Sequence, residues 1–365
     1  MKSFNIGRIS GIQVELHSTF VLFIALLVIA LALFDPMNLI STIILITFLF
    51  VSVFFHELTH SLVSLKKGIK VKKIILLPIG GMALTDNFPE EPKDEFLISI
   101  AGPLFNFAVV IILAIIIVLF DFIPFPSIEK VLEQGINLSL MNYPVFALMY
   151  VNLMLGTFNL LVPALPLDGG RVWRSLLAMK FGKTKATKFV TKISEIIALI
   201  LFTAGIFGAG ILLSVIAVFI YFASKYENEL QQMKETLKGF NLKTVISKQI
   251  PLLKEDLSLE KLFELMETKN QYGFLIKEIT GIKYIDLSLM KKIKRKEWNT
   301  KKVSEVSIEV HPIPATAKAE KAMEIFMTSP HELIAVKTGN RLSGIIERKE
   351  MEKLFEIAKA KKDKK

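Results

Sequence analysis

The chain has 365 residues, 52% of them hydrophobic, and the apolar residues come in long runs that a soluble globular protein does not need. It contains no cysteine, which excludes disulfides, thiolate metal ligands and a cysteine nucleophile. The formal net charge is +11. Much of this charge lies in short loops between the apolar runs, and no basic motif with interleaved aromatic residues is visible, so we expect no nucleic-acid partner.

Six apolar runs predict a multi-pass α-helical membrane protein embedded in the lipid bilayer. The six predicted transmembrane helices cover residues 19–34, 39–65, 96–120, 144–161, 190–206 and 209–223. No small-residue cleavage site follows the first run, which therefore does not resemble a signal peptide. The hydrophobic excess ends near Tyr226, and the rest has the composition of a soluble domain.

The second predicted span contains a metal-binding motif, His56-Glu57-Leu58-Thr59-His60. Positions i and i+4 of a helix share a face, so His56 and His60 can both bind one zinc ion. Glu57 lies beside the first ligand, where a carboxylate can deprotonate the attacking water. Ionisable groups are costly in an apolar span, so we interpret the motif as a hydrolytic site within a membrane.

The segment between the second and third spans, residues 71–84, does not have helical character. Its β-branched residues, followed by Pro78 and the pair Gly80-Gly81, predict a strand, a turn and a returning strand. The edge of such a hairpin offers Gly80 and Gly81 as substrate-binding residues, on which an extended substrate adds as a further strand. The alternative is a re-entrant loop that only packs the helix bundle.

A catalytic zinc ion usually has three protein ligands, and the third candidate is Asp168. It follows the fourth span in a segment, residues 159–171, that contains two prolines and ends in Asp-Gly-Gly-Arg. Non-helical backbone is tolerated at membrane depth where it is buried in protein or lines a wet cavity. The alternative role for Asp168 is to cap the amphipathic stretch that begins at Arg171.

The distribution of cations predicts the orientation. Lysines and arginines gather in the loops 66–93 and 171–188, whereas the alternating loops are nearly free of them. Both termini are therefore expected to be cytoplasmic. At ~1.5 Å per residue, His56 lies about 15 Å from the cytoplasmic end of its span, so the metal is expected nearer that face.

The C-terminal region contains an internal repeat. Residues 259–268 resemble residues 319–328, and a strand-like run follows each copy, at 273–276 and 333–336. Two copies of a helix-plus-strand unit predict an α/β module with pseudo-two-fold symmetry. We therefore expect a membrane domain over residues 1–226, a linker over 227–240 and a tandem domain over 241–365. Of the remaining histidines, His17 is expected at the membrane interface, and His311 and His331 at surface or turn positions.

The membrane domain resembles the site-2 protease family of intramembrane zinc metalloproteases. The resemblance rests on residues 55–60, 77–81, 101–106 and 166–171, which occur in the family's order and place it over about residues 1–226. It implies hydrolysis of peptide bonds in or near the transmembrane segment of a single-span membrane protein, with zinc on His56, His60 and Asp168 and with Glu57 as general base. The family's asparagine corresponds to Asn159, a candidate oxyanion stabiliser, although Val162 is one residue more than the family pattern has.

The C-terminal region resembles paired CBS domains, as in the prokaryotic and archaeal branch of that family. In such domains a strand often ends in a motif whose aspartate holds a nucleotide ribose. The first copy here, residues 283–289, lacks the acid at that place, and the second copy has Glu350 instead. Two possibilities remain open, an adenine-nucleotide sensor and a purely structural or dimerising module.

Two other functions are compatible with parts of the pattern. One is a CBS-gated membrane metal transporter with His56, Glu57 and His60 along its path, but a transporter should have polar residues distributed over several spans or repeated halves. The other is an inactive membrane scaffold, for which the loss of at least one ligand is expected.

Overall fold

The computed structural model describes residues 3–78, 80–85, 89, 91–120, 124–127, 129–131, 142–277, 281–310, 312–328, 331–339 and 341–363, so the prediction for His311 lies outside the described residues. The chain divides into two compact units, Met1–Asn228 and Glu229–Lys365.

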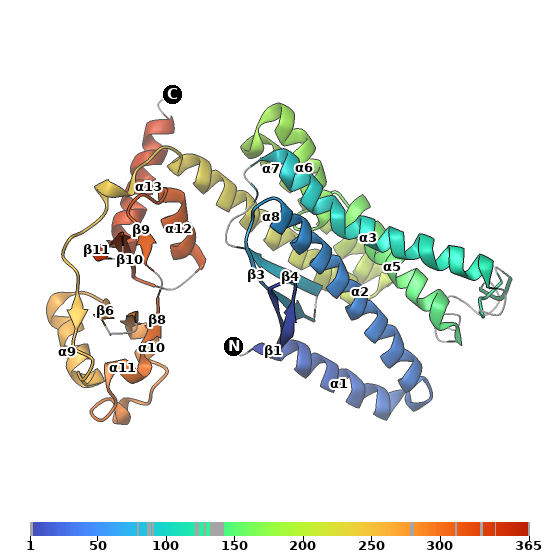
Figure 1. Ribbon diagram of the computed structural model, residues 1–365, viewed down its shortest axis with the longest axis horizontal. Coiled ribbons are helices and arrows are strands. Elements are labelled where there is room, and N and C mark those ends of the chain that lie inside the picture. The colour runs from blue at the N-terminus through green and yellow to red at the C-terminus, as the bar shows by residue number, and fades with distance from the viewer. Residues whose placement is uncertain are drawn as a thin grey trace. The chain divides into compact units, whose positions relative to one another are not determined.

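A four-stranded sheet lies at one end of the first unit (Figure 1). Its strands, in the order in which they pair, are β1 (Ser3–Ile9), β2 (Ile12–His17), β3 (Val71–Leu77) and β4 (Gly80–Thr85). Strands β3 and β4 pair antiparallel, which confirms the predicted hairpin and contradicts the alternative of a re-entrant loop. The β1–β2 hairpin is not among the predicted elements. It turns at Ser10 and Gly11, both at positive φ, and β2 pairs in parallel with β3.

An ion pair ties β2 to β3. Lys73 Nζ lies 2.8 Å from an oxygen of Glu15, whose side chain is 8% exposed. The hydrogen bond from Lys73, with a second from Ser3, lowers the pKa of the Glu15 carboxyl. The sheet therefore holds a charged carboxylate beside its apolar core residues Ile12 and Ile74.

Helices, most of them apolar, make up most of the other described part of the first unit. They are α1 (Ser18–Phe34), α2 (Leu39–Lys66), α3 (Pro92–Leu119), α5 (Pro144–Leu161), α6 (Asp168–Phe181), α7 (Lys183–Ala204) and α8 (Ile211–Leu237), with a 3-10 turn at Pro36–Asn38 and a π-helical segment at Gly205–Ala209. Within the described residues, five helices (α2, α3, α5, α7 and α8) are long and apolar enough to cross a membrane. The first predicted span, α1, has only 17 residues, so the count of six remains a prediction.

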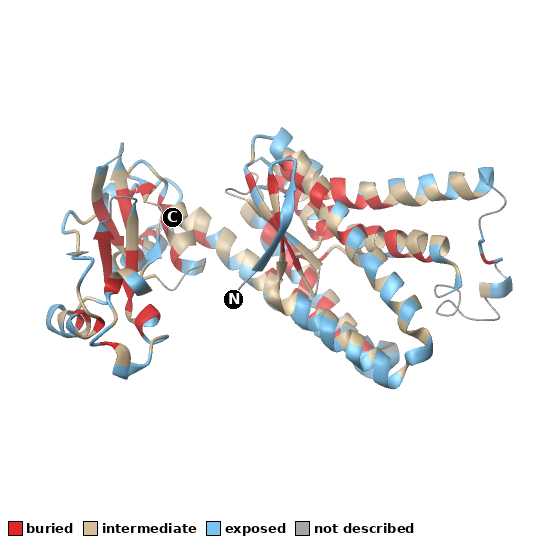
Figure 2. Cartoon of the chain, turned by 60° about the horizontal axis from the view of Figure 1, so that its bottom comes forward, coloured by how far each residue is buried: buried red, intermediate tan, exposed pale blue. Residues whose placement is uncertain are grey.

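The outward faces of these helices are exposed (Figure 2), and many large apolar side chains lie on them. Ile111 on α3 and Leu199 on α7 are 59% and 65% exposed, and α1 has no buried residue at all. Helices with exposed apolar faces suit the hydrocarbon core of a membrane, because contact with lipid tails avoids the unfavourable exposure of apolar side chains to water.

A buried ionic cluster joins four of the helices. Arg174 of α6 donates from Nε to Glu95 of α3 and from Nη1 to Glu227 of α8, both over 2.7 Å. Lys183 of α7 lies 3.1 Å from the other oxygen of Glu95. Glu95 and Arg174 are only 2% and 6% exposed. Buried charges need such partners, so the cluster fixes α6 against its neighbours.

The second unit contains the predicted repeat. In the first copy, β5 (Leu252–Leu253), α9 (Leu259–Lys269), β6 (Gly273–Lys277) and β7 (Ile282–Asp286) follow one another, and in the second copy β9 (Ile313–Pro314), α12 (Ala319–Thr328), β10 (Leu333–Thr338) and β11 (Arg341–Glu347) do so. Each copy pairs its first two strands in parallel and its last two antiparallel. This shared topology confirms the prediction of two helix-plus-strand copies.

The remaining elements complete the two copies. They are α10 (Leu287–Met290), α11 (Val303–Val306), β8 (Ile308–Glu309), α13 (Arg348–Asp363) and the 3-10 turns Leu242–Thr244 and Arg295–Glu297. A shared core joins the copies, with Leu275 and Tyr284 from the first and Leu333 and Ile345 from the second. The end of α8 packs into the core of the second copy through Leu237, so the segment predicted as a linker is helical over most of its length.

Candidate functional site

Three side chains from two distant parts of the first unit come together. His56 and His60 lie one turn apart on α2, and Asp168 is the first residue of α6. His56 Nε2 and His60 Nε2 are 3.1 Å apart, and they lie 3.0 Å and 3.2 Å from the same oxygen, Oδ2 of Asp168. The structure thus brings together all three residues predicted to bind the metal.

The three atoms fit a zinc ion. Zinc bonds of 2.0–2.1 Å in a tetrahedral site place ligand atoms about 3.3 Å apart, close to the spacing here. The second ring nitrogen of each histidine is engaged elsewhere: His56 Nδ1 donates to Asn106 Oδ1 (2.5 Å) and His60 Nδ1 donates to the carbonyl of Ile98 (2.6 Å). This leaves both Nε2 lone pairs directed at the cluster, as a metal site requires.

Gly102 of α3 provides the space at the cluster. A Cβ added there would overlap the Nε2 atoms of both His56 and His60. Any side chain at this position would therefore fill the place where the ligand atoms converge. Gly102 belongs to one of the motifs that carried the family resemblance, but its role was not predicted; a Gly-Pro pair inside an apolar helix was the available signal.

Glu57 faces the hairpin. A Cβ added at Gly81 of β4 would overlap the side chain of Glu57, so the strand backbone passes directly against the candidate base. The preceding Gly80 has φ +137, a conformation that favours glycine. Because β4 is an edge strand of the described sheet, one of its backbone edges has no partner strand in that sheet.

The chain before α6 positions Asp168 through tightly packed backbone. Ala164 and Leu165 are completely buried, and the Leu165 amide donates to Ser194 of α7. Side chains at Gly169 or Gly170 would overlap the carbonyl groups of residues 160–164. No side-chain cap is formed at the start of α6, where Leu167 is the N-cap residue, so the alternative role of Asp168 as a cap is not what the structure has.

Asn159 lies on α5, where its amide donates to the carbonyl of Leu155 in the same helix. Its role as oxyanion stabiliser stays a prediction. The buried polar residues Ser52, Asn106 and Asn152 were not predicted as site residues, although polar groups in apolar spans were a signal for them.

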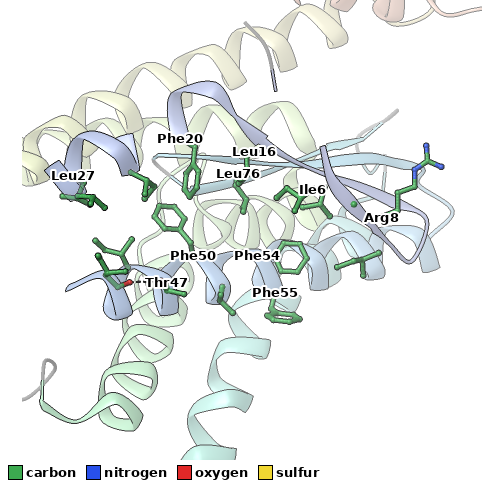
Figure 3. Close-up of a pocket in the computed structure, with 18 of the residues that line it drawn as sticks. Ile6, Arg8, Leu16, Phe20, Leu27, Thr47, Phe50, Phe54, Phe55 and Leu76 are labelled. Carbon is green, nitrogen blue, oxygen red and sulfur yellow. Dashed lines mark hydrogen bonds between the residues drawn. The ribbon is translucent and has the colours of Figure 1, made fainter. Parts of the chain in front are cut away.

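An apolar cavity of about 710 Å³ lies between β1, β2, β3, α1 and α2 (Figure 3). Phe54 and Phe55, which directly precede His56, line it together with Phe20 and Phe50. Among its lining residues, Arg8 and Thr47 alone carry polar side chains. The cavity thus offers an apolar binding surface that extends along α2 to the residue next to a candidate ligand.

In the second unit the first copy buries its own polar side chains. Tyr284 donates to Asp286, and its hydroxyl accepts from the backbone amide of Glu332. Burial raises the pKa of the Tyr284 hydroxyl. Burial also lowers the pKa of the His331 imidazole, whose ring lies against that of Tyr284. Asp286 caps α10 through the Leu289 amide, whereas the half-buried Glu350 of the second copy pairs with Lys353.

Comparison with known proteins gives consistent matches. The model of peptidase family M50 matches residues 44–204. The zinc metalloprotease MJ0392 of Methanocaldococcus jannaschii is 32% identical over 362 residues, 99% of this chain and 98% of that protein. A solved site-2 protease from Methanocaldococcus jannaschii is 39% identical, with a TM-score of 0.47, over 62% of this chain and 95% of that one. A CBS-domain protein from Agrobacterium tumefaciens matches at 15% identity and a TM-score of 0.28, over 29% of this chain and 90% of that one.

Proposed function

Since the chain belongs to peptidase family M50, the site-2 protease family of membrane zinc metalloproteases, we propose that it hydrolyses peptide bonds in or near transmembrane segments of other proteins. The observation that carries the proposal is the convergence of His56, His60 and Asp168 on one point beside Glu57. These groups come from helices whose outer faces are apolar, so the chemistry is proposed to take place within the bilayer.

Each site residue has its own role in hydrolysis. His56, His60 and Asp168 would hold a zinc ion, which would supply Lewis acidity toward a peptide carbonyl and toward water. Glu57 accepts the proton of the attacking water and returns it to the leaving amine. Asn106 and the Ile98 carbonyl hold the two imidazoles in the orientation that points Nε2 at the cluster. Asn159 is the proposed stabiliser of the oxyanion.

The substrate is proposed to be a single-span membrane protein that binds in extended form. A transmembrane helix hides its backbone in hydrogen bonds and must unwind before cleavage. The free edge of β4 at Gly80 and Gly81 suits an unwound segment, because strand addition satisfies its backbone groups beside Glu57. The apolar cavity along α2 suits the side chains that flank the cleaved bond.

The orientation of the protein in the membrane and the role of the second unit are also proposals. The cation-rich loops support cytoplasmic termini and a metal site that water reaches from the cytoplasmic side.

The duplicated topology of the second unit supports a paired CBS module. Because Asp286 serves as a helix cap and Glu350 is paired with Lys353, we favour a structural or dimerising role over nucleotide binding.

The experiment is cleavage of a single-span substrate by the full chain in proteoliposomes. Glu57→Gln is expected to lower the rate by about 10²–10⁴-fold while zinc stays bound. Asp168→Ala is expected to abolish both zinc binding and cleavage. The exposed residues Glu255 and Asp256 provide matched controls, Glu255→Gln and Asp256→Ala, that should cleave normally. Normal rates in the two site variants would contradict the proposal.

A further inference from the structure

A series of buried hydrogen bonds leads from the metal cluster to the backbone of α5. His56 Nδ1 donates to Asn106 Oδ1 over 2.5 Å, and Asn106 Nδ2 donates to Asn152 Oδ1 over 2.8 Å. Asn152 Nδ2 in turn donates to Ser52 Oγ and to the backbone carbonyl of Leu148, both over 2.9 Å. None of these four residues is more than 4% exposed. The bonds connect α2, α3 and α5.

The donor and the acceptor of every hydrogen bond in this series follow from its last bond, the one to the carbonyl of Leu148. The carbonyl of Leu148 can only accept a hydrogen bond, so Asn152 must present its NH₂ group there and its oxygen to Asn106. Asn106 must then present NH₂ to Asn152 and oxygen to His56. Turning either amide around would set two acceptors or two donors face to face in a buried place, which costs about 1–3 kcal/mol for each unsatisfied group. His56 therefore carries its proton on Nδ1.

We propose that Asn152 is a positioning residue of the metal site: through Asn106 it fixes the tautomer of His56 in which Nε2 is free to bind zinc. The inference rests on the proposed metal site. His60 needs no such relay, because its Nδ1 donates directly to the Ile98 carbonyl, itself an obligate acceptor. Both ligands are thus oriented by backbone carbonyls, one directly and one through two amides.

Two substitutions at Asn152 separate this role from simple packing. Asn152→Leu keeps the branched shape and the number of heavy atoms but removes the acceptor, so Asn106 is free to turn and offer His56 a donor. Asn152→Asp in its neutral, protonated form still accepts from Asn106 and donates to Leu148. Ser52→Ala removes a bond that the relay does not need, because Asn152 still donates to Leu148, and serves as the control.

The measurements are zinc affinity, by competition with a chromophoric chelator, and the His56 Nδ1–H resonance in zinc-loaded protein labelled with ¹⁵N-histidine. Asn152→Leu is expected to bind zinc 10–100-fold more weakly, with that resonance shifted or lost to exchange. Asn152→Asp is expected to lose less than tenfold and to keep the resonance, as is Ser52→Ala.

Several results would overturn the inference. One is wild-type affinity and an unchanged resonance in Asn152→Leu; another is an equal loss in the Leu and Asp variants. If Asn152→Leu does not fold, Asn152→Asp still tests the inference. That variant keeps the hydrogen bonds to Asn106 and Leu148, so loss of the His56 Nδ1–H resonance in it would contradict the proposed role of Asn152. Zinc binding without peptidase activity in the unsubstituted protein would refute only the proposed function. Absence of zinc binding would refute the metal site and this inference with it.

Discussion

Gly102→Ala offers a sharp test of the metal site because the change is one methyl group. In a helix this substitution is ordinarily stabilising, by about 0.5–1 kcal/mol. Here the added Cβ would lie 2.7 Å from His56 Nε2, whereas ordinary contact begins at 3.4 Å, so the ring must retreat by about 0.7 Å. Zinc sites tolerate deviations of about 0.2 Å in ligand distance. We therefore expect zinc affinity to fall at least about 100-fold, or about 2.8 kcal/mol.

The assay is zinc binding by the purified full chain in zinc buffers of graded strength, with thermal unfolding measured in parallel. Gly281→Ala is the control for the substitution itself, since no atom lies within 4 Å of the added methyl group there. Wild-type zinc affinity in Gly102→Ala would refute the assignment of the space in front of Gly102 to the metal. An unfolding temperature that fell together with affinity would point to general disruption of α3 instead.

Three further predictions concern other parts of the molecule. Gly81→Ala should displace Glu57 and lower kcat by about 100-fold with zinc content unchanged, and a lower zinc content would contradict this. Arg174→Met should lower stability by about 3–5 kcal/mol, because Glu95 stays buried without its main partner; thermal unfolding in detergent measures it. Burial lowers the pKa of His331, so the unfolded second unit binds more protons below the ordinary value of about 6.5. The stability of the second unit should therefore be greatest above that pH and should decline as the pH falls. Hydrogen exchange measures this decline, which should be weaker in His331→Gln.

The local parts of the site followed from the sequence, because helix geometry places His56 and His60 on one face whatever the rest of the fold. Asp168 was also predictable, since a carboxylate in a proline-broken segment after an apolar span has few other uses. The repeat was predictable for a similar reason: two copies of one pattern predict one topology twice.

The missed features depend on contacts between distant segments. Asn152 and Asn106 are single polar residues in separate spans, and only their packing shows that they form one chain with His56. The β1–β2 hairpin had a local signal in the alternation from Gln13 to Leu16 after Ser10-Gly11. Its parallel pairing with β3 had none, because β3 begins more than fifty residues later.

That parallel pairing bears on how the protein is made. Parallel neighbours need a crossover connection, and here the crossover from β2 to β3 consists of the helices α1 and α2. The sheet can close only after both helices have been synthesised, and Asp168 follows His60 by a further 108 residues. At about 5–20 residues per second, the two histidines wait roughly 5–20 s for their third partner. The order of synthesis therefore keeps the three groups of the metal site apart until Asp168 has been made.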